Sequence, residues 1–284
     1  MTANFAPIYR TVLGALICLV GGIGSPPTHA QTRLKAHYNI SMTGVSIGQI
    51  TWSTAIGDER YTTSAGGKAS GVLSVLVNGE GSVDIRGTVV DGHLTPRIFT
   101  STIVDDEGKS ELRMTFEDGA VKELIAPPPP PGSDRLAVKE ADTRNVSDPL
   151  SAMLVTAEDP LASENCKRVL SIFDGQRRYD LALSYKRVEK VAIEHSYRGL
   201  VLVCGVVLQP IAGYRADSKL VKYVAGRHDM ELWFAPIAGT PLIAPIRVLM
   251  PTLIGTLEIA ADQFDAVALP PPPEALPPAA AVPR

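Results

Sequence analysis

Residues 34–56 read LKAHYNISMTGVSIGQITWSTAI, and this stretch decides the fold class. On each side of a short glycine-containing break, every second position carries an apolar, aromatic or β-branched side chain. These positions are Leu34, Ala36, Tyr38, Ile40 and Met42 before the break, and Ile50, Trp52, Thr54 and Ile56 after it. A period of two indicates strands with one buried face, whereas a helix repeats about every 3.6 residues. The stretch therefore predicts a β-hairpin.

The break contains GVSIG at 44–48, which matches Gly-x-Ser-x-Gly, the pattern of the nucleophile elbow in α/β-hydrolases. An elbow serine stands on a sharp turn from a strand into a helix. Ser46 is instead followed by QITWSTAI, which has the period of a strand, so both glycines are expected to serve a hairpin turn. The histidines beyond residue 30 stand in no recognisable triad context; they are His37, His93, His195 and His228. We interpret Ser46 as a hairpin residue.

Similar strands and turns recur along the chain. Turn signals occur at 57–58, 78–79, 91–92, 107–108, 118–119 and 174–175, and the Asp-Gly and Asn-Gly pairs among them suit the positive φ angles of tight hairpin turns. Their spacing, about ten to fifteen residues, is typical of an antiparallel meander. We predict an all-β fold in which this meander forms a curved sheet or barrel-like domain with one or two short helices.

The strands are expected in two series, at about 34–126 and 166–264, joined by a proline-rich crossing that contains APPPPPG. Asp148 is placed to cap a short helix over 149–155, with Pro149 at its first position. Residues 70–77, SGVLSVLV, are a candidate for one or two further helical turns. A single domain over 31–266 is favoured over two, because neither series carries a strong core alone.

Both ends of the chain are expected to lie outside this domain. Arg10, the apolar run TVLGALICLVGGIG and a small-residue site ending at Ala30 have the layout of a signal peptide over 1–30. The alternative is an uncleaved anchor, but the run is short for a span of about 20 residues. Residues 267–284 are rich in proline and predict a disordered tail. We therefore expect an exported, periplasmic protein that is cleaved after Ala30.

The composition excludes some partners. The chain has 27 Lys and Arg residues against 30 Asp and Glu residues, and the basic residues are scattered, so nucleic-acid binding is not expected. Beyond residue 30, no stretch is long and apolar enough to cross a bilayer. No pattern in the sequence indicates a cofactor.

Two cysteines follow the expected signal peptide, Cys166 and Cys204. In an oxidising compartment two such cysteines usually form a disulfide, and free thiols are the alternative. In the chain-entropy model, closing a loop of this length contributes about 3–4 kcal/mol to stability. A metal site is disfavoured, because no histidine stands at ligand spacing beside either thiol.

Charges concentrate in FDGQRRYD, residues 173–180. The favoured interpretation of Asp174, Arg177, Arg178 and Asp180 is a structural network across neighbouring strands. The alternative is a site for an anionic group, because guanidinium groups match carboxylate and phosphate geometry. We assign no catalytic, cofactor-binding or metal-binding residue from the sequence.

From about Tyr38 to about Phe264, the chain resembles the DUF3108 family of exported bacterial proteins. The resemblance rests on four segments, namely YNISMTGVSIGQITWS, SDPLSAMLV, CKRVLSIFDGQRRYDL and VVLQPIAGY. It implies a β-rich exported domain in which GVSIG forms the first hairpin. It supplies no catalytic residues.

The leading hypothesis is a non-enzymatic periplasmic protein that binds or handles an envelope component, such as a lipid or a glycan, on the concave face of its sheet. Exported half-barrels that carry lipid or lipoprotein are an architectural precedent, although fold does not fix function. One rival is an envelope hydrolase acting on polysaccharide or peptidoglycan. It would need two facing acids about 5–10 Å apart, drawn from Asp148, Asp174 and Asp180. The other rival is a structural or interaction module.

Overall fold

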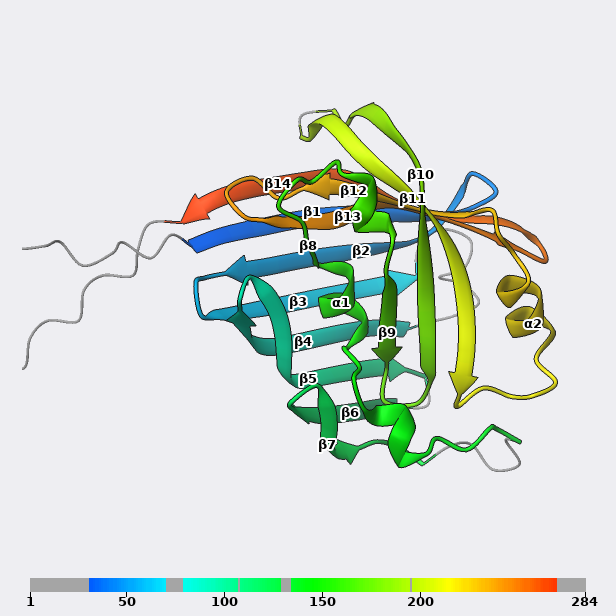
Figure 1. Cartoon of the computed structure of the whole chain (residues 1–284). Helices are drawn as coiled ribbons and strands as arrows, with labels where there is room; N and C mark the ends of the chain where they lie inside the picture. The colour runs from blue at the N-terminus through cyan, green and yellow to red at the C-terminus, as the bar shows by residue number, and fades with distance from the viewer. Residues whose placement is uncertain (1–30, 70–78, 107, 129–133, 195, 270–284) are drawn as a thin grey trace, which may run out of the picture.

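The computed structural model describes residues 31–69, 79–106, 108–128, 134–194 and 196–269. Within them, fourteen strands form one antiparallel sheet (Figure 1). The strands before the crossing are β1 (Gln31–Met42), β2 (Val45–Ile56), β3 (Arg60–Ala69), β4 (Gly79–Val90), β5 (His93–Asp105), β6 (Gly108–Glu117) and β7 (Ala120–Ile125). Those after it are β8 (Val155–Thr156), β9 (Val169–Phe173), β10 (Arg178–Ala192), β11 (Arg198–Ala212), β12 (Met230–Pro236), β13 (Leu242–Thr252) and β14 (Gly255–Leu269). The helices are α1 (Pro149–Met153), α2 (Lys219–Ala225) and the 3-10 turns η2 (Glu140–Thr143) and η3 (Ser163–Cys166).

The first and last long strands pair at the middle of the sheet. The strand order is β7-β6-β5-β4-β3-β2-β1-β14-β13-β12-β11-β10-β9, with β8 attached to β13. Gln31 lies opposite Leu269, so β14 extends three residues past the expected domain boundary at 266. Residues 267–269 are therefore part of the sheet, because residues 31–33 of β1 provide hydrogen-bonding partners for them. The rest of the predicted tail, 270–284, lies outside the described residues.

The sheet curves until its two ends face each other across a common core. Figure 1 shows β9–β11 crossing the direction of β4–β6. Phe99 of β5 and Trp233 of β12 belong to the same buried cluster, so side chains from both ends fill the enclosed side. The hydrogen-bonded sheet does not close into a full barrel.

The crossing segment joins the two open edges. The amide of Val146 donates to the carbonyl of Gly119 at 3.0 Å, beside β7. Ser147 exchanges backbone hydrogen bonds with the β9 edge, donating to Ser171 and accepting from Phe173 at 2.9 and 3.0 Å. This short bridge pairs backbone groups that an open sheet edge would leave exposed.

The GVSIG stretch forms a hairpin. Thr43 and Gly44 take the turn with φ angles of 53° and 84°, and Ser46 lies within β2. The Ser46 hydroxyl donates to Asn39 Oδ1 at 2.6 Å. Gly48 corrects the expectation that both glycines serve the turn, because it lies in β2, where a Cβ would stand 3.2 Å from the carbonyl of Lys68. A strand follows residue 48 where an elbow requires a helix.

Asp148 caps α1 as predicted. Its Oδ1 accepts hydrogen bonds from the amides of Leu150 and Ser151, both at 3.0 Å, and Pro149 is the first helical residue. The helix ends at Met153, two residues before the predicted end, because residues 155–156 leave it to pair with β13 as β8. The expected turns at 70–77 lie outside the described residues. No helix in the described ranges has the length and apolar character needed to cross a membrane.

The middle of β11, most of β12 and the first half of β13 are buried on both faces. Along β11, residues 201–206 are all buried; alternate side chains face the enclosed core and a second cluster. We call the face toward this second cluster the outer face. The predicted disulfide lies there, joining Cys166 of η3 to Cys204 of β11 with their Cα atoms 5.5 Å apart. It fastens the covering segment to the sheet.

Candidate functional site

A cavity of about 630 Å³ lies on the outer face of the sheet, under α2. Its floor consists of aliphatic and thioether side chains that alternate along four strands: Leu181 from β10, Val206 and Leu208 from β11, Met230 and Leu232 from β12, and Val248 and Met250 from β13. Because successive strand residues point to opposite faces, these side chains share one face with Cys204. The cavity therefore belongs to the second cluster and not to the enclosed core.

Helix α2 forms the roof of this cavity. The Ser218 hydroxyl accepts from the amide of Val221 at 3.3 Å, and Gly226 follows the last helical residue. The apolar side chains Leu220, Val221 and Val224 line the cavity, and Val224 is the one buried residue of the helix. A seven-residue helix held at this depth covers the strands without filling the space beneath it.

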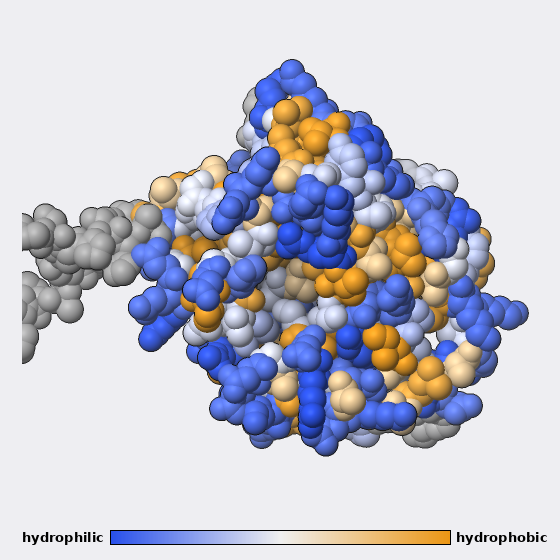
Figure 2. All heavy atoms as spheres, in the orientation of Figure 1, coloured by the Kyte–Doolittle hydropathy of each residue, from blue (hydrophilic) through white to orange (hydrophobic). Residues whose placement is uncertain are grey.

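The cavity continues into a second section beside the β13–β14 turn, which apolar residues line except for Thr252. The two sections share five side chains, namely Leu208, Leu220, Val221, Val224 and Met250. The second section adds Met42, Leu253, Ile254 and Leu257, and Ile254 is 79% exposed. On the face shown in Figure 2, apolar side chains gather in patches over β9–β11 and hydrophilic ones surround them.

Three arginines stand at the polar end of the cavity: Arg135, Arg177 and Arg215. Arg177 pairs with Asp174 at 3.5 Å, and its guanidinium lies 6.0 Å from the centre of the Tyr214 ring. Arg215 makes two hydrogen bonds to Asp217, both at 3.1 Å. The cavity thus combines an apolar floor with a cationic end.

The charged cluster predicted from FDGQRRYD is divided between two places. Asp174 and Arg177 line the cavity. Arg178 and Asp180 pair with each other at 2.5 Å, on the opposite side of β10 from the cavity residue Tyr179. The turn between β9 and β10 therefore holds one half of the cluster at the cavity, and the first residues of β10 hold the other half in an ion pair.

The tyrosines at the cavity are held in the protonated form. Burial raises the pKa of Tyr214 to about 12, and the nearby Asp174 charge adds to the shift. Burial likewise raises the pKa of Tyr179 well above its usual range. A tyrosine hydroxyl is already neutral at pH 7, and the raised pKa values extend the neutral form to higher pH, so both hydroxyls can donate hydrogen bonds.

The three acids considered for hydrolysis do not share the cavity. Asp174 lines it, whereas Asp180 is paired with Arg178 and Asp148 is fully buried at the start of α1. Burial raises the pKa of Asp148, and its Oδ2 has no hydrogen-bond partner among the described residues. Of these three acids only Asp174 lines the cavity, so they do not form the pair of acids facing one cleft that glycoside hydrolysis needs.

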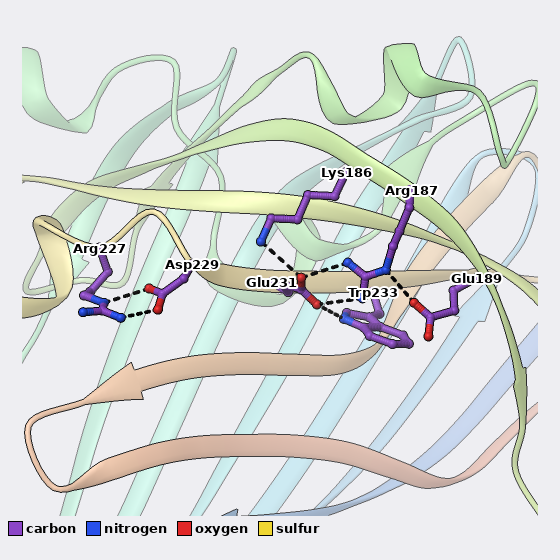
Figure 3. A network of polar contacts seen from close by, with 7 residues as sticks. All are labelled: Lys186, Arg187, Glu189, Arg227, Asp229, Glu231 and Trp233. Atoms are coloured by element: carbon purple, nitrogen blue, oxygen red, sulfur yellow. Dashed lines mark hydrogen bonds and ion pairs between the residues drawn. The ribbon is translucent and has the colours of Figure 1, made fainter.

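A second polar cluster, drawn in Figure 3, surrounds Glu231. One carboxylate oxygen accepts from Lys186 at 3.1 Å and Arg187 at 2.9 Å; the other accepts from Arg187 at 3.2 Å and Trp233 Nε1 at 2.8 Å. The hydrogen bonds from Arg187 hold the pKa of Glu231 down to about 2. Glu231 borders the cavity, but its oxygens are occupied, so we interpret this cluster as structural.

The described ranges contain no group of three or more His, Cys, Asp or Glu side chains that could hold a metal ion.

Some of the residues that line the cavity were not predicted from the sequence. Arg135, Tyr214 and Arg215 were not singled out, because backbone pairing between segments far apart in the sequence brings them together. Helix α2 was also missed, although Ser218 as a cap and Gly226 after the last turn are recognisable signals.

The fold and the site define a barrel-like β protein whose outer face carries an apolar cavity with a cationic end. The chain belongs to the DUF3108 family, described as proteins of unknown function, and the match covers residues 37–262. No curated protein matches the sequence. Among solved structures, the chain is similar to a beta-barrel-like protein of the domain of unknown function DUF1849 from Brucella abortus. The TM-score is 0.48 at 12% identity, and the alignment covers 84% of this chain and 98% of that chain.

Proposed function

We propose that this protein is exported to the periplasm and there binds the apolar chain of an envelope lipid in the cavity under α2. The observation that carries the proposal is the floor of aliphatic and thioether side chains from β10–β13, roofed by apolar residues of α2. Ligand sites are typically cavities of about 300–1,000 Å³ with an apolar lining and a few polar groups. A lipid chain fits this lining better than a glycan, whose hydroxyls need hydrogen-bond partners along their length.

The proposed ligand lies on a different face of the sheet from the one first expected. The enclosed, concave side is packed with large side chains such as Tyr61, Phe99 and Trp233, which are almost fully buried. The apolar cavity is instead on the outer face, where α2 covers the strands. Export is supported by the layout of residues 1–30 and by the disulfide, because such bonds persist in oxidising compartments. Cleavage after Ala30 would leave the described residues of β1, Gln31–Met42, in the mature protein.

The test is a titration with Nile red, an uncharged dye whose fluorescence rises in apolar sites, followed by displacement with cetyl alcohol. The purified mature protein is expected to bind both. Leu208→Trp should abolish most of the binding, because this half-buried side chain lines both sections of the cavity and a larger ring would fill it.

Thr62→Trp is the matched control, because it adds the same ring at an exposed position of β3. This variant should bind like the wild type. Equal binding by Leu208→Trp and the wild type, with both folded by circular dichroism, would place any dye site elsewhere and refute the proposal.

A further inference from the structure

We propose that the cavity selects amphiphiles with an anionic head group, which Arg135 binds with support from Arg177 and Arg215. This inference rests on the proposed function, because the apolar floor must hold the chain before the head group can reach the arginines. The chemical class is a single-chain carboxylate or phosphate ester. Arginine suits both, since its planar fork of donors matches their oxygens.

Most of the hydrogen-bond donors of Arg135 have no acceptor among the described residues. Its Nη1 makes one long hydrogen bond, 3.4 Å, to the carbonyl of Gly213. Its Nε is buried without an acceptor among the described residues, and within those residues the side chain has no carboxylate partner. A guanidinium without a carboxylate partner keeps a positive charge, with which the head group of an anion in the cavity would interact favourably.

The backbone places a second arginine directly opposite the first. Arg135 and Arg215 face each other across an antiparallel bridge, with hydrogen bonds between Leu136 and its neighbours Tyr214 and Gly213, both at 2.8 Å. Like charges directly opposite each other destabilise such a pairing. Asp217 pairs with Arg215 and Asp174 pairs with Arg177, so Arg135 is the one of the three whose guanidinium forms no ion pair within the described residues.

Gly213 holds the third arginine near this bridge. Its φ angle is +80°, and a Cβ at this position would stand 1.9 Å from the carbonyl oxygen of Gln176. Only glycine allows this approach, which keeps the 176–177 turn against the bridge. Arg177 consequently lies beside Tyr214, whose hydroxyl stays protonated and can donate to an anion.

The experiment compares three ligands with the same chain, namely palmitate, cetyl phosphate and cetyl alcohol, by displacement of Nile red at low salt. The wild-type protein should bind at least one of the two anions about ten- to one-hundred-fold more tightly than the alcohol. Whichever anion binds more tightly distinguishes a carboxylate from a phosphate head group. Arg135→Gln should remove this preference and leave affinity for the alcohol unchanged within about two-fold.

Lys222→Gln is the charge-matched control, because Lys222 lies on α2 and does not line the cavity. It should keep the preference for anions. Equal binding of anions and alcohol by the wild type would overturn this inference and leave the proposed function standing. The same loss in Arg135→Gln and Lys222→Gln would also overturn it, since it would show general attraction in place of a site. Failure of all three ligands to bind would refute the proposed function itself.

Discussion

Strands β2–β5 and β10–β13 belong to one sheet, but they are buried in different ways. Along β3, buried Tyr61 and Thr63 alternate with exposed Thr62 and Ser64. Along β11, six consecutive residues, 201–206, are buried. The first region therefore meets water on its outer face, and the second is covered there by η3, β8 and α2.

This difference shows how a cavity arises on a continuous sheet. An outer face that stays bare can be polar, and the outer face of β3 carries small polar side chains. A covered face must be apolar, and a cover as short as α2 cannot fill the space above four strands. The site is thus a consequence of two-sided burial combined with an incomplete second layer.

The largest expected effect is a difference in the free energy of unfolding between two truncations, one of an outer-face side chain in each region. Phe234→Ala removes a ring that is 1% exposed in the second cluster and should lower the free energy of unfolding by about 3–5 kcal/mol. Thr62→Ala alters the outer face of β3 and should stay within about 0.5 kcal/mol. Urea denaturation measures both. Similar losses would show that the two outer faces are equally buried in solution.

The disulfide joins the covering segment that contains η3 to β11, in the region of β10–β13. Replacing Cys166 and Cys204 together with alanine should cost about 3–4 kcal/mol in the chain-entropy model. Urea denaturation of this variant, compared with the wild type with and without reductant, measures the loss. Mass spectrometry of the exported protein should find no free thiol, and two free thiols would remove the bridge from this account.

The Glu231 cluster should make the second region sensitive to acid. The pKa of Glu231 is lowered to about 2 in the folded protein, below its unfolded value of about 4.3. Its contribution is therefore complete above about pH 4.3 and is lost as the pH falls toward 2. Glu231→Gln should lower stability at pH 7 by about 1–2 kcal/mol. It should also flatten the profile of unfolding free energy over this acid window, and an unchanged slope would contradict the assignment.

Asp148, in the crossing between the two regions, should act in the opposite direction. Burial raises its pKa, so the folded protein holds a proton that the unfolded chain has released above about pH 3.9. Stability from this group is therefore full below that pH and falls as the pH rises toward the folded pKa. Asp148→Asn keeps a capping side chain without the charge, so it should gain stability relative to the wild type at pH 7 and lose that advantage near pH 3. A gain that is the same at both pH values would show that Asp148 does not titrate in this way.

Ser46 should show the smallest effect. Its hydroxyl makes one exposed hydrogen bond to Asn39, so Ser46→Ala should change the free energy of unfolding by less than about 0.5 kcal/mol. Any hydrolytic activity found in the purified protein should also survive this change. Lost turnover with an intact circular dichroism spectrum would make Ser46 a nucleophile and contradict the hairpin interpretation.

Much of the fold was predictable because it rests on local rules. Alternation and glycine turns indicated the strands, and Asp148 before Pro149 indicated the cap of α1. The run GLVLVCGVVL at 199–208 lacks alternation, which is typical of strands buried on both faces. The segment that covers those strands could not be predicted, because no local pattern specifies contacts between distant parts of a chain. The arginine end of the cavity could not be predicted for the same reason, since it depends on the backbone bridge between Arg135 and Arg215.

The central claim is that the covered region binds a lipid chain and the bare region does not. Native mass spectrometry of protein purified from the cell envelope without detergent tests it most directly. We expect a non-covalent adduct with the mass of a lipid on the wild-type protein and on Thr62→Trp, and none on Leu208→Trp. The absence of an adduct from all three proteins, or an equal adduct on all three, would contradict the claim.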